Sequence, residues 1–501
     1  MGEKSPTVSA PSAASAVVRP GARERRMSTG ALSLSGAPPW LIQGGMGVAV
    51  SHWPLARAVS LAGQLGVVSG TAIDAVFARR LQRFGVDDAL RRVLARFPLQ
   101  DVVKDVVARY GPRRAGARLA FRPVPMPSHR GSPAADDLMV LAAYAEVAQA
   151  KEGHSGRVGI NLLTKVQIPT VPTLFGAMLA GVDWVLMGAG IPSHIPAVLD
   201  QLARGEVVET SLDVSGRDGT RSGPTLRFDP RRWLAGSNLQ RPHFVAVVSS
   251  HVLALALARR TRGVDGFVVE SPVAGGHNAP PRGALQLDDR GNPLYGARDD
   301  VDYATMRELG VPFWVAGGVN TREDVVRALD LGATGVQVGT LFAFCRESGI
   351  SESIRRQVTS TVMTTPLHVR TSVRASSTGY PFKLLELPGT LSEPDVVAGR
   401  QRVCDMGYLR EAYVRDNGTV GYRCAAEPED AYLRKSGDAA NTVDRLCLCN
   451  GLLATADLAQ VRDGVAEPAL VTSGDDVNRI APLLQGREDY TAADVIAHLQ
   501  P

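Results

Sequence analysis

The stretch VPFWVAGGVNTREDVVRALDLGATGVQVGTLF, residues 311–342, decides the fold. An apolar run at 311–316 is followed by a Gly-Gly turn, a helical pattern at 321–333 and a second apolar run at 335–339. The helical pattern begins with a Thr that can cap a helix and ends in a Gly-Ala turn. Two apolar runs joined by a helix are typical of parallel neighbouring strands. The stretch therefore predicts a strand, helix, strand unit.

Six further apolar runs precede this stretch, and helical patterns lie between them at 54–66, 172–181 and 251–263. The runs are almost continuous, as strands covered on both faces of a parallel sheet are. Eight strand and helix units in sequence predict an α/β fold, a closed (β/α)₈ or TIM barrel. The six further runs are at 40–43, 66–69, 157–163, 182–187, 243–249 and 264–271.

Two segments exceed one barrel repeat. Residues 75–150 predict inserted helices, and residues 205–240 predict an inserted hairpin. We expect a disordered basic leader at 1–36, a TIM barrel at 37–387 and a C-terminal cysteine-containing subdomain at 388–501. The subdomain ends in a helix that Thr491 caps. A mitochondrial transit peptide is the alternative interpretation of the leader, because Arg and Ser are frequent there.

Charge and hydropathy exclude several classes of protein. The 501 residues carry a net charge of +5, of which residues 1–30 contribute +3, so the rest of the chain has no basic patch typical of a nucleic-acid-binding protein. No window is apolar enough for a membrane span, and the first residues lack the apolar core of a secretion signal. We therefore expect a cytoplasmic protein without a nucleic acid or membrane partner.

Glycines follow the last two predicted strands. Gly317 and Gly318 come after the run at 311–316, and Gly339 and Thr340 end the next run. In a barrel, the loops after strands 7 and 8 form the usual phosphate site. The same glycines also suit ordinary tight turns. The segment MGAGIPS at 187–193 lacks the third glycine of a dinucleotide fingerprint, so a mononucleotide, FMN, is the expected cofactor.

The segment VVESPVAGGHNAPPRG, residues 268–283, begins at the end of the sixth predicted strand. Gly275 and Gly276 precede His277, so the loop can carry the imidazole over the barrel mouth. Histidine titrates near neutrality and is a natural general base. His277 is therefore the candidate catalytic residue.

The segment LIQGGMGVAVS, residues 41–51, follows the first strand. Gly45, Met46 and Gly47 form a loop whose main chain can lie against a planar ring, and Gln43 is available to hydrogen-bond it. Asn161 ends the third strand and points into the mouth. Each of these residues also suits a turn or simple packing.

Together, GGMG at strand 1, GINLL at strand 3, AGGHN at strand 6, AGGV at strand 7 and GVQVGT at strand 8 resemble the nitronate monooxygenases. The resemblance covers about residues 39–385 and implies a TIM barrel with non-covalent FMN. It implies His277 as the catalytic base. The cofactor-binding residues that the motifs indicate are Gln43, Gly45, Met46, Gly47, Asn161, Gly275, Gly276, Gly317, Gly318, Gly339 and Thr340.

The insertions and the C-terminal subdomain resemble a longer branch of that family, which includes trans-acting enoyl reductases of polyketide and polyunsaturated fatty acid biosynthesis. The resemblance therefore implies a flavin-dependent oxidoreductase, a flavoprotein that oxidises alkyl nitronates or nitroalkanes with O₂. The alternative is an NADPH-dependent enoyl reductase that acts on an enoyl thioester, with an acyl carrier protein as its partner.

Four cysteines lie close together in the sequence, with the spacing C-x₁₉-C-x₂₂-C-x-C. Thiolates at Cys404, Cys424, Cys447 and Cys449 would suit Zn²⁺ or an iron–sulfur cluster, although the spacing matches no standard pattern. The alternative is that they are buried, reduced thiols.

Overall fold

The structure, a computed structural model, describes residues 37–112, 120–216, 222–234, 236 and 239–501. The leader predicted at 1–36 lies outside the described residues.

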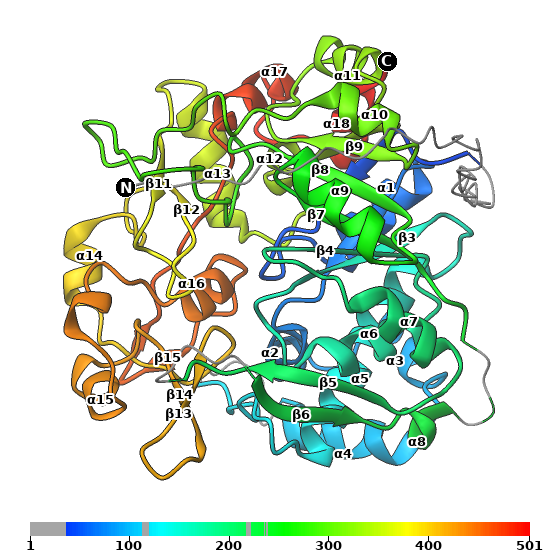
Figure 1. Ribbon diagram of the computed structural model, residues 1–501, viewed down its shortest axis with the longest axis vertical. Coiled ribbons are helices and arrows are strands. Elements are labelled where there is room, and N and C mark those ends of the chain that lie inside the picture. The colour runs from blue at the N-terminus through cyan, green and yellow to red at the C-terminus, as the bar shows by residue number, and fades with distance from the viewer. Residues whose placement is uncertain (1–36, 113–119, 217–221, 235, 237–238) are drawn as a thin grey trace, which may run out of the picture. The chain divides into compact units, whose positions relative to one another are not determined.

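The barrel consists of strands that run in parallel, and Figure 1 shows helices packed around them. Around the sheet the strand order is 1-10-9-8-7-4-3-2, numbered along the chain. The predicted apolar runs form these strands, so the predicted TIM barrel is confirmed. The eight strands are β1 (Leu41–Gln43), β2 (Gly66–Ser69), β3 (Val158–Leu163), β4 (Trp184–Gly188), β7 (His243–Val248), β8 (Gly266–Glu270), β9 (Phe313–Ala316) and β10 (Gly335–Val338).

Helices return the chain between successive barrel strands. Where the sequence predicts a helix from a cap and an apolar period, the structure has one. At Thr321, for example, the hydroxyl accepts a hydrogen bond from Asp324 N, and Asp324 bonds back to the cap, which begins α11. The helices are α1 (Trp53–Leu61), α6 (Thr170–Leu179), α7 (Ile195–Ala203), α9 (His251–Arg260), α10 (Tyr303–Glu308), α11 (Arg322–Asp330), α12 (Thr340–Ala343) and α13 (Glu352–Val362).

The barrel closes at the seam between β1 and β2. A parallel bridge joins Ile42 to Leu65, just before β2 begins. The Gln43 side chain extends this seam, because its Oε1 accepts a hydrogen bond from Val67 N at 3.0 Å. Its Nε2 donates to Ser51 Oγ at 2.7 Å and to Gly44 O. Gln43 is fully buried, so its amide satisfies main-chain groups where the strand ladder does not.

Both predicted insertions are present. Helices of the first insertion pack against one another beside α6, and an antiparallel hairpin forms the second. The inserted elements are α2 (Ile73–Phe84), α3 (Asp88–Leu94), α4 (Gln100–Tyr110), α5 (Pro133–Lys151), β5 (Val208–Asp213), β6 (Ser222–Phe228) and α8 (Arg231–Leu234).

The chain beyond the barrel forms short elements. They are β11 (Val369–Ser372), β12 (Phe382–Leu385), α14 (Pro394–Gly399), β13 (Glu411–Val414), β14 (Val420–Arg423), α15 (Glu429–Arg434), η1 (Ala439–Asn441), α16 (Leu448–Thr455), β15 (Val461–Arg462), β16 (Val465–Ala466), η2 (Val477–Ile480), α17 (Ala481–Leu484) and α18 (Ala492–Leu499).

The final helix returns to the barrel. α18 contacts α1, α11 and α12, so it covers the barrel next to β1 and β10. Tyr490 OH donates to Leu341 O at 2.8 Å, and His498 Nε2 bonds to Asn320 O at 3.0 Å. A capping box at Thr491, with Asp494, begins the helix. The predicted division of the chain at residue 388 stays a prediction, because residues on both sides of it pack into one core.

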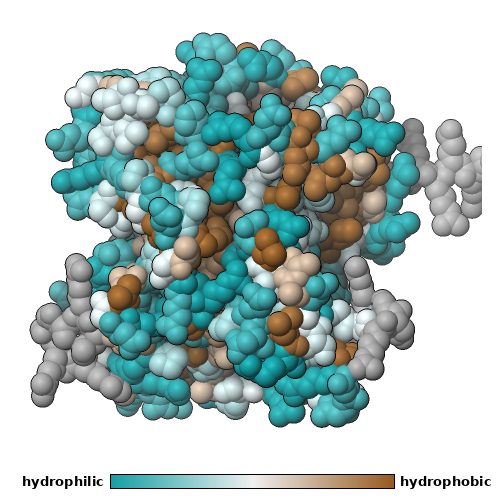
Figure 2. Space-filling model, turned by 90° about the vertical axis from the view of Figure 1, so that its left-hand side faces the viewer, coloured by the Kyte–Doolittle hydropathy of each residue, from teal (hydrophilic) through white to brown (hydrophobic). Residues whose placement is uncertain are grey.

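Figure 2 shows the face on which the C-terminal elements α14 and α15 lie, with hydrophobic residues in several groups between hydrophilic ones. Within the described parts of the chain, no helix is both long and apolar enough to cross a membrane.

We expect the substitution Gln43→Leu to lower the free energy of unfolding by about 1–3 kcal/mol, because it leaves Val67 N without its buried acceptor. Thermal unfolding of the purified protein measures the effect. Gln500→Leu is the matched control, since Gln500 is exposed. Equal melting temperatures for the two variants would show that the seam does not depend on this amide.

Candidate active site

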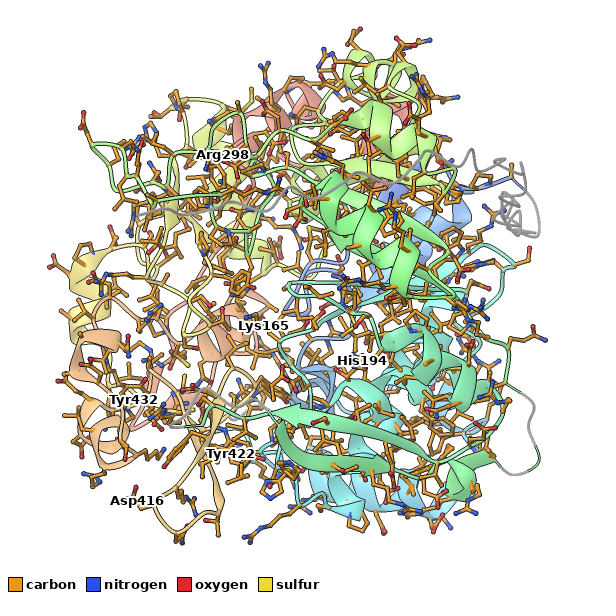
Figure 3. The ribbon with its side chains drawn as sticks, in the orientation of Figure 1. Lys165, His194, Arg298, Asp416, Tyr422 and Tyr432 are labelled. Carbon is orange, nitrogen blue, oxygen red and sulfur yellow. The ribbon has the colours of Figure 1, made fainter. Side chains whose placement is uncertain are left out.

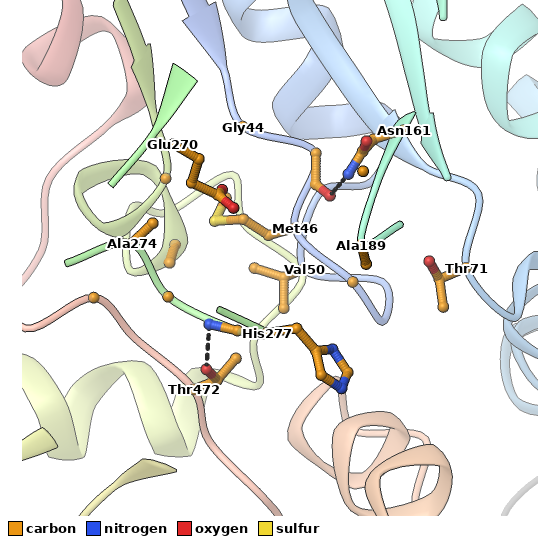
Figure 4. A pocket seen from close by; sticks show the side chains of 18 of the residues that line it. Gly44, Met46, Val50, Thr71, Asn161, Ala189, Glu270, Ala274, His277 and Thr472 are labelled. Carbon is orange, nitrogen blue, oxygen red and sulfur yellow. Dashed lines mark hydrogen bonds between the residues drawn. The ribbon is translucent and has the colours of Figure 1, made fainter. Parts of the chain in front are cut away.

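A cavity of about 220 Å³ lies at the carboxyl ends of the barrel strands. The loops after β1, β3, β4, β8, β9 and β10 contribute to its walls, as barrel active sites require. Residues of the C-terminal region complete it (Figure 4). The cavity is therefore formed by both parts of the chain.

Nearly all residues predicted to bind a cofactor line this cavity, and so does His277. Gln43 does not, because its amide is used within the barrel seam. The amide of Gln43 bonds to Gly44 O and Ser51 Oγ in the loop after β1 and does not line the cavity. The predicted residues that line the cavity are Gly45, Met46, Gly47, Asn161, Gly275, Gly276, His277, Gly317, Gly318, Gly339 and Thr340.

The loop after β1 lies directly against β3. Asn161 Nδ2 donates to Gly45 O at 2.8 Å, as the dashed line in Figure 4 shows. A Cβ at Gly45 would lie 2.2 Å from Asn161 Cβ, so only glycine allows this approach. Asn161 Oδ1 is buried and has no hydrogen-bond partner among the described residues. A ligand with an N–H group can supply the missing donor.

The loops after β9 and β10 form the end of the cavity that the sequence assigns to phosphate. Gly317 has φ +84°, and a Cβ there would lie 2.4 Å from Ser271 Oγ. The Thr340 hydroxyl is already engaged, because it donates to Asp476 Oδ1 at 2.9 Å. Burial raises the pKa of Asp476 above its usual range.

The segment 472–476 approaches the same loops from the C-terminal region, and the sequence analysis missed it. Gly276 N donates to Thr472 Oγ1 at 2.9 Å. A Cβ at Gly275 would lie 2.8 Å from the Ser473 carbonyl carbon. Ser473 Oγ is buried and has no partner in the described part of the chain. The pattern of hydroxyls and glycine in TSGDD is typical of anion-binding loops, but nothing in its spacing connects it with β9 or β10.

His277 contacts the C-terminal region through its imidazole. Its Nε2 lies 2.7 Å from Ser376 Oγ, and its ring packs edge to face on Phe382 with centroids 4.8 Å apart. Burial lowers the pKa of His277 to about 4, and the charge of Lys165 acts in the same direction. Lys165 itself, labelled in Figure 3, lies over the ring of Tyr380. The imidazole is therefore neutral at neutral pH.

Glu270 is a second titratable group that the sequence analysis missed, although it stands inside the quoted motif. It ends β8, and Figure 4 shows its carboxyl group pointing into the cavity. Burial raises the pKa of Glu270 to about 7. The cavity thus holds a neutral imidazole and a carboxyl group that is partly protonated at neutral pH.

The C-terminal region gives the cavity a largely apolar wall. This wall consists of Leu409, Leu448, Leu452, Tyr408 and Cys449. No Lys or Arg is among the described residues that line the cavity. Apolar contact and main-chain or hydroxyl hydrogen bonds are therefore the interactions that the cavity offers.

The four cysteines do not form a metal site in the structure. They all line one small apolar cavity, yet no group of three or more His, Cys, Asp or Glu side chains among the described residues is placed to hold a metal ion. Burial raises the pKa of Cys447 and of Cys449. Metal ligands must be thiolates, and burial favours neutral thiols at Cys447 and Cys449, whereas the hydrogen bond with Cys404 lowers the pKa of Cys424 to about 7. The expected Zn²⁺ or iron–sulfur cluster has no support from this arrangement.

Comparison with known proteins supports the resemblance in the barrel's second half. The nitronate monooxygenase family model matches residues 235–387. A probable nitronate monooxygenase from Bacillus subtilis is 40% identical over 93 residues, which are 19% of this chain and 25% of that protein. A probable nitronate monooxygenase from Staphylococcus saprophyticus is 30% identical over 132 residues, 25% of this chain and 36% of that protein. The matches thus span about a third or less of these relatives.

Solved structures with a similar fold include FabK from Thermotoga maritima, with a TM-score of 0.45, 16% identity and 92% of each chain covered. A nitroalkane oxidase from Streptomyces ansochromogenes has a TM-score of 0.44 and 15% identity, with 92% of this chain and 95% of that chain covered. The assignment of the fold rests on the strand order of this chain.

The matched region holds β7 to β10, the AGGHN loop with His277 and the expected phosphate-site residues Gly317, Gly318, Gly339 and Thr340. Residues 235–387 are thus similar to the nitronate monooxygenases, as the sequence motifs predict.

Proposed function

We propose that this protein is a flavin-dependent oxidoreductase that oxidises alkyl nitronates with O₂. One observation carries the proposal: the family match includes the AGGHN loop, and that loop lines the same cavity as the glycine loops after β1, β9 and β10. Barrel enzymes carry their chemistry at this face. The identity of the nitronate is open.

The cavity fits FMN on three counts. Asn161 Oδ1 is a buried acceptor that lacks a donor, and Gly45 lets the loop after β1 lie directly against Asn161 at the cavity wall. At the other end, the loop glycines 317 and 318 and the buried Ser473 hydroxyl suit a phosphate group. Without a cation in the described lining, main-chain N–H and hydroxyl groups would bind the phosphate. Bound FMN would supply the electron acceptor.

His277 is placed to handle a proton of the substrate. In the tautomer whose Nε2–H donates to Ser376 Oγ, Nδ1 keeps a free lone pair. Because the imidazole is neutral, it is ready to accept a proton, although its low pKa makes it a weak base. A nitronate is already deprotonated and needs no base. This charge state therefore favours a nitronate over a neutral nitroalkane as the substrate.

An NADPH-dependent enoyl reductase is the second candidate. The observation that favours it is the apolar wall formed by Leu409, Leu448 and Leu452, which suits the chain of an enoyl thioester. In that case the expected partners are NADPH and a carrier of the thioester, such as an acyl carrier protein.

We expect the substitution His277→Asn to reduce turnover of a neutral nitroalkane about 10²-fold or more, because it removes the proton acceptor. Turnover of preformed nitronate should change by less than about threefold, since that substrate needs no base. Oxygen consumption with each substrate measures both rates. His154→Asn, which changes a histidine outside the cavity lining, is the control. Equal losses with both substrates would show that His277 is not the base.

We expect the substitution Asn161→Ala to weaken FMN binding about tenfold, which corresponds to the loss of one buried hydrogen bond of about 1.4 kcal/mol. Quenching of flavin fluorescence on binding to the flavin-free protein measures the affinity. Asn417→Ala, in the exposed turn between β13 and β14, is the matched control. Unchanged affinity in Asn161→Ala would place the flavin ring elsewhere.

We expect anaerobic mixing with NADPH to leave the visible flavin absorbance of the purified protein unchanged, whereas a nitronate bleaches it. Stopped-flow absorbance compares the two reductants. Rapid bleaching by NADPH, followed by reoxidation with an enoyl thioester, would contradict the monooxygenase and favour the reductase.

A further inference from the structure

We propose that Glu270 is a substrate-binding residue that donates a hydrogen bond, through its protonated carboxyl group, to the negatively charged oxygen of the bound substrate. The inference rests on the proposed function, because a nitronate carries such an oxygen. It adds Glu270, with a protonated carboxyl group, to the residues that the proposed function uses.

The position of Glu270 provides the first argument. It is the last residue of β8, and its main chain pairs with Ala316 at the end of β9. Ser271 N donates to Ala316 O at 2.9 Å, which fixes the direction in which the strand ends. The side chain therefore starts from the barrel wall and reaches the same cavity as His277.

The surroundings of Glu270 provide the second argument. Residues 271–277 follow it directly, and the glycine loop with Met46 lines the cavity nearby. Glu270 is half-buried at the cavity wall, and no ion pair or hydrogen bond to another described residue contributes to the pKa of its carboxyl group. Its pKa of about 7 has burial as its cause. The carboxyl group is therefore partly protonated at neutral pH, and its protonated form is a hydrogen-bond donor.

The other titratable groups around the cavity leave this role open. His277 is neutral and bonded to Ser376, Asp476 accepts from Thr340, and burial raises the pKa values of Tyr408 and Cys449. Two groups whose environments shift their pKa values in opposite directions are typical of a divided acid and base function. Here His277 accepts a proton and Glu270 donates a hydrogen bond.

Substrate binding should therefore weaken as Glu270 loses its proton. A carboxylate cannot donate a hydrogen bond, and it repels an anionic oxygen. Above about pH 7, the dissociation constant of a nitronate should rise roughly tenfold per pH unit in the wild-type protein. The variant Glu270→Gln keeps an N–H donor that does not titrate, so its affinity should stay constant. The variant Glu270→Ala lacks a hydrogen-bond donor at this position and should bind the nitronate weakly at every pH.

Anaerobic titration calorimetry with propyl nitronate between about pH 6 and pH 9 tests this on the FMN-loaded protein. Glu308→Gln changes an exposed carboxyl group on α10 and is the matched control. A pH dependence that persists in Glu270→Gln but disappears in Asp476→Asn would overturn the inference. So would unchanged affinity in Glu270→Ala.

A second measurement needs no substrate. Glu270 has a higher pKa in the folded protein than the value of about 4.3 expected in the unfolded chain. The folded state then binds more protons, so the contribution of Glu270 is fully present below about pH 4 and is lost as pH rises through about 7. The melting temperature of Glu270→Gln relative to wild type should therefore increase with pH across this window. A constant difference would show that the carboxyl group has an ordinary pKa and would refute the inference.

The two proposals fail in different ways. Absence of oxygen consumption with every nitronate would reject the proposed activity, while the calorimetric and stability measurements still decide the role of Glu270. Normal turnover with a pH-independent affinity in the wild-type protein would reject the role of Glu270 alone.

Discussion

Closure of the barrel between β1 and β2 is the constraint on which the rest of the structure depends. A short bridge with main-chain hydrogen bonds between Leu65 and the strand residues Leu41 and Gln43 joins them, and the buried amide of Gln43 adds a hydrogen bond from Val67 N. The same amide holds Ser51 and Gly44, so the loop that lines the cavity is attached to the seam. One side chain therefore contributes both to barrel closure and to the position of this loop.

The barrel was predictable because its strands are buried on both faces, and such strands have continuous apolar runs that are visible in a sequence. Caps such as Thr321 and Thr491 mark helix starts for the same local reason. The place of α18 was not predictable. Its amphipathic pattern shows that one face is buried, but nothing in the pattern identifies α1 and α11 as the helices that cover it.

The candidate site was predictable where it depends on strand ends, as at Asn161, His277 and Gly317. Gln43 shows the limit of that reasoning, because a glutamine amide suits a ligand and a main-chain seam equally well. Glu270 lies within the quoted segment 268–283. Its charge state depends on burial, and the spacing of residues in the sequence does not reveal burial. The cysteines show the reverse: their spacing suggested metal ligands, whereas burial favours neutral thiols.

The hydrogen bond from Gly276 to Thr472 joins residues that are 196 positions apart. During synthesis, the loop that contains Gly276 therefore leaves the ribosome well before the segment that packs against it. At about 5–20 residues per second, the delay is roughly 10–40 s. Throughout that interval the half-built cavity exposes apolar strand ends to solvent. Nascent chains of this protein thus pass through a period in which the barrel mouth lacks the segment that completes the cavity.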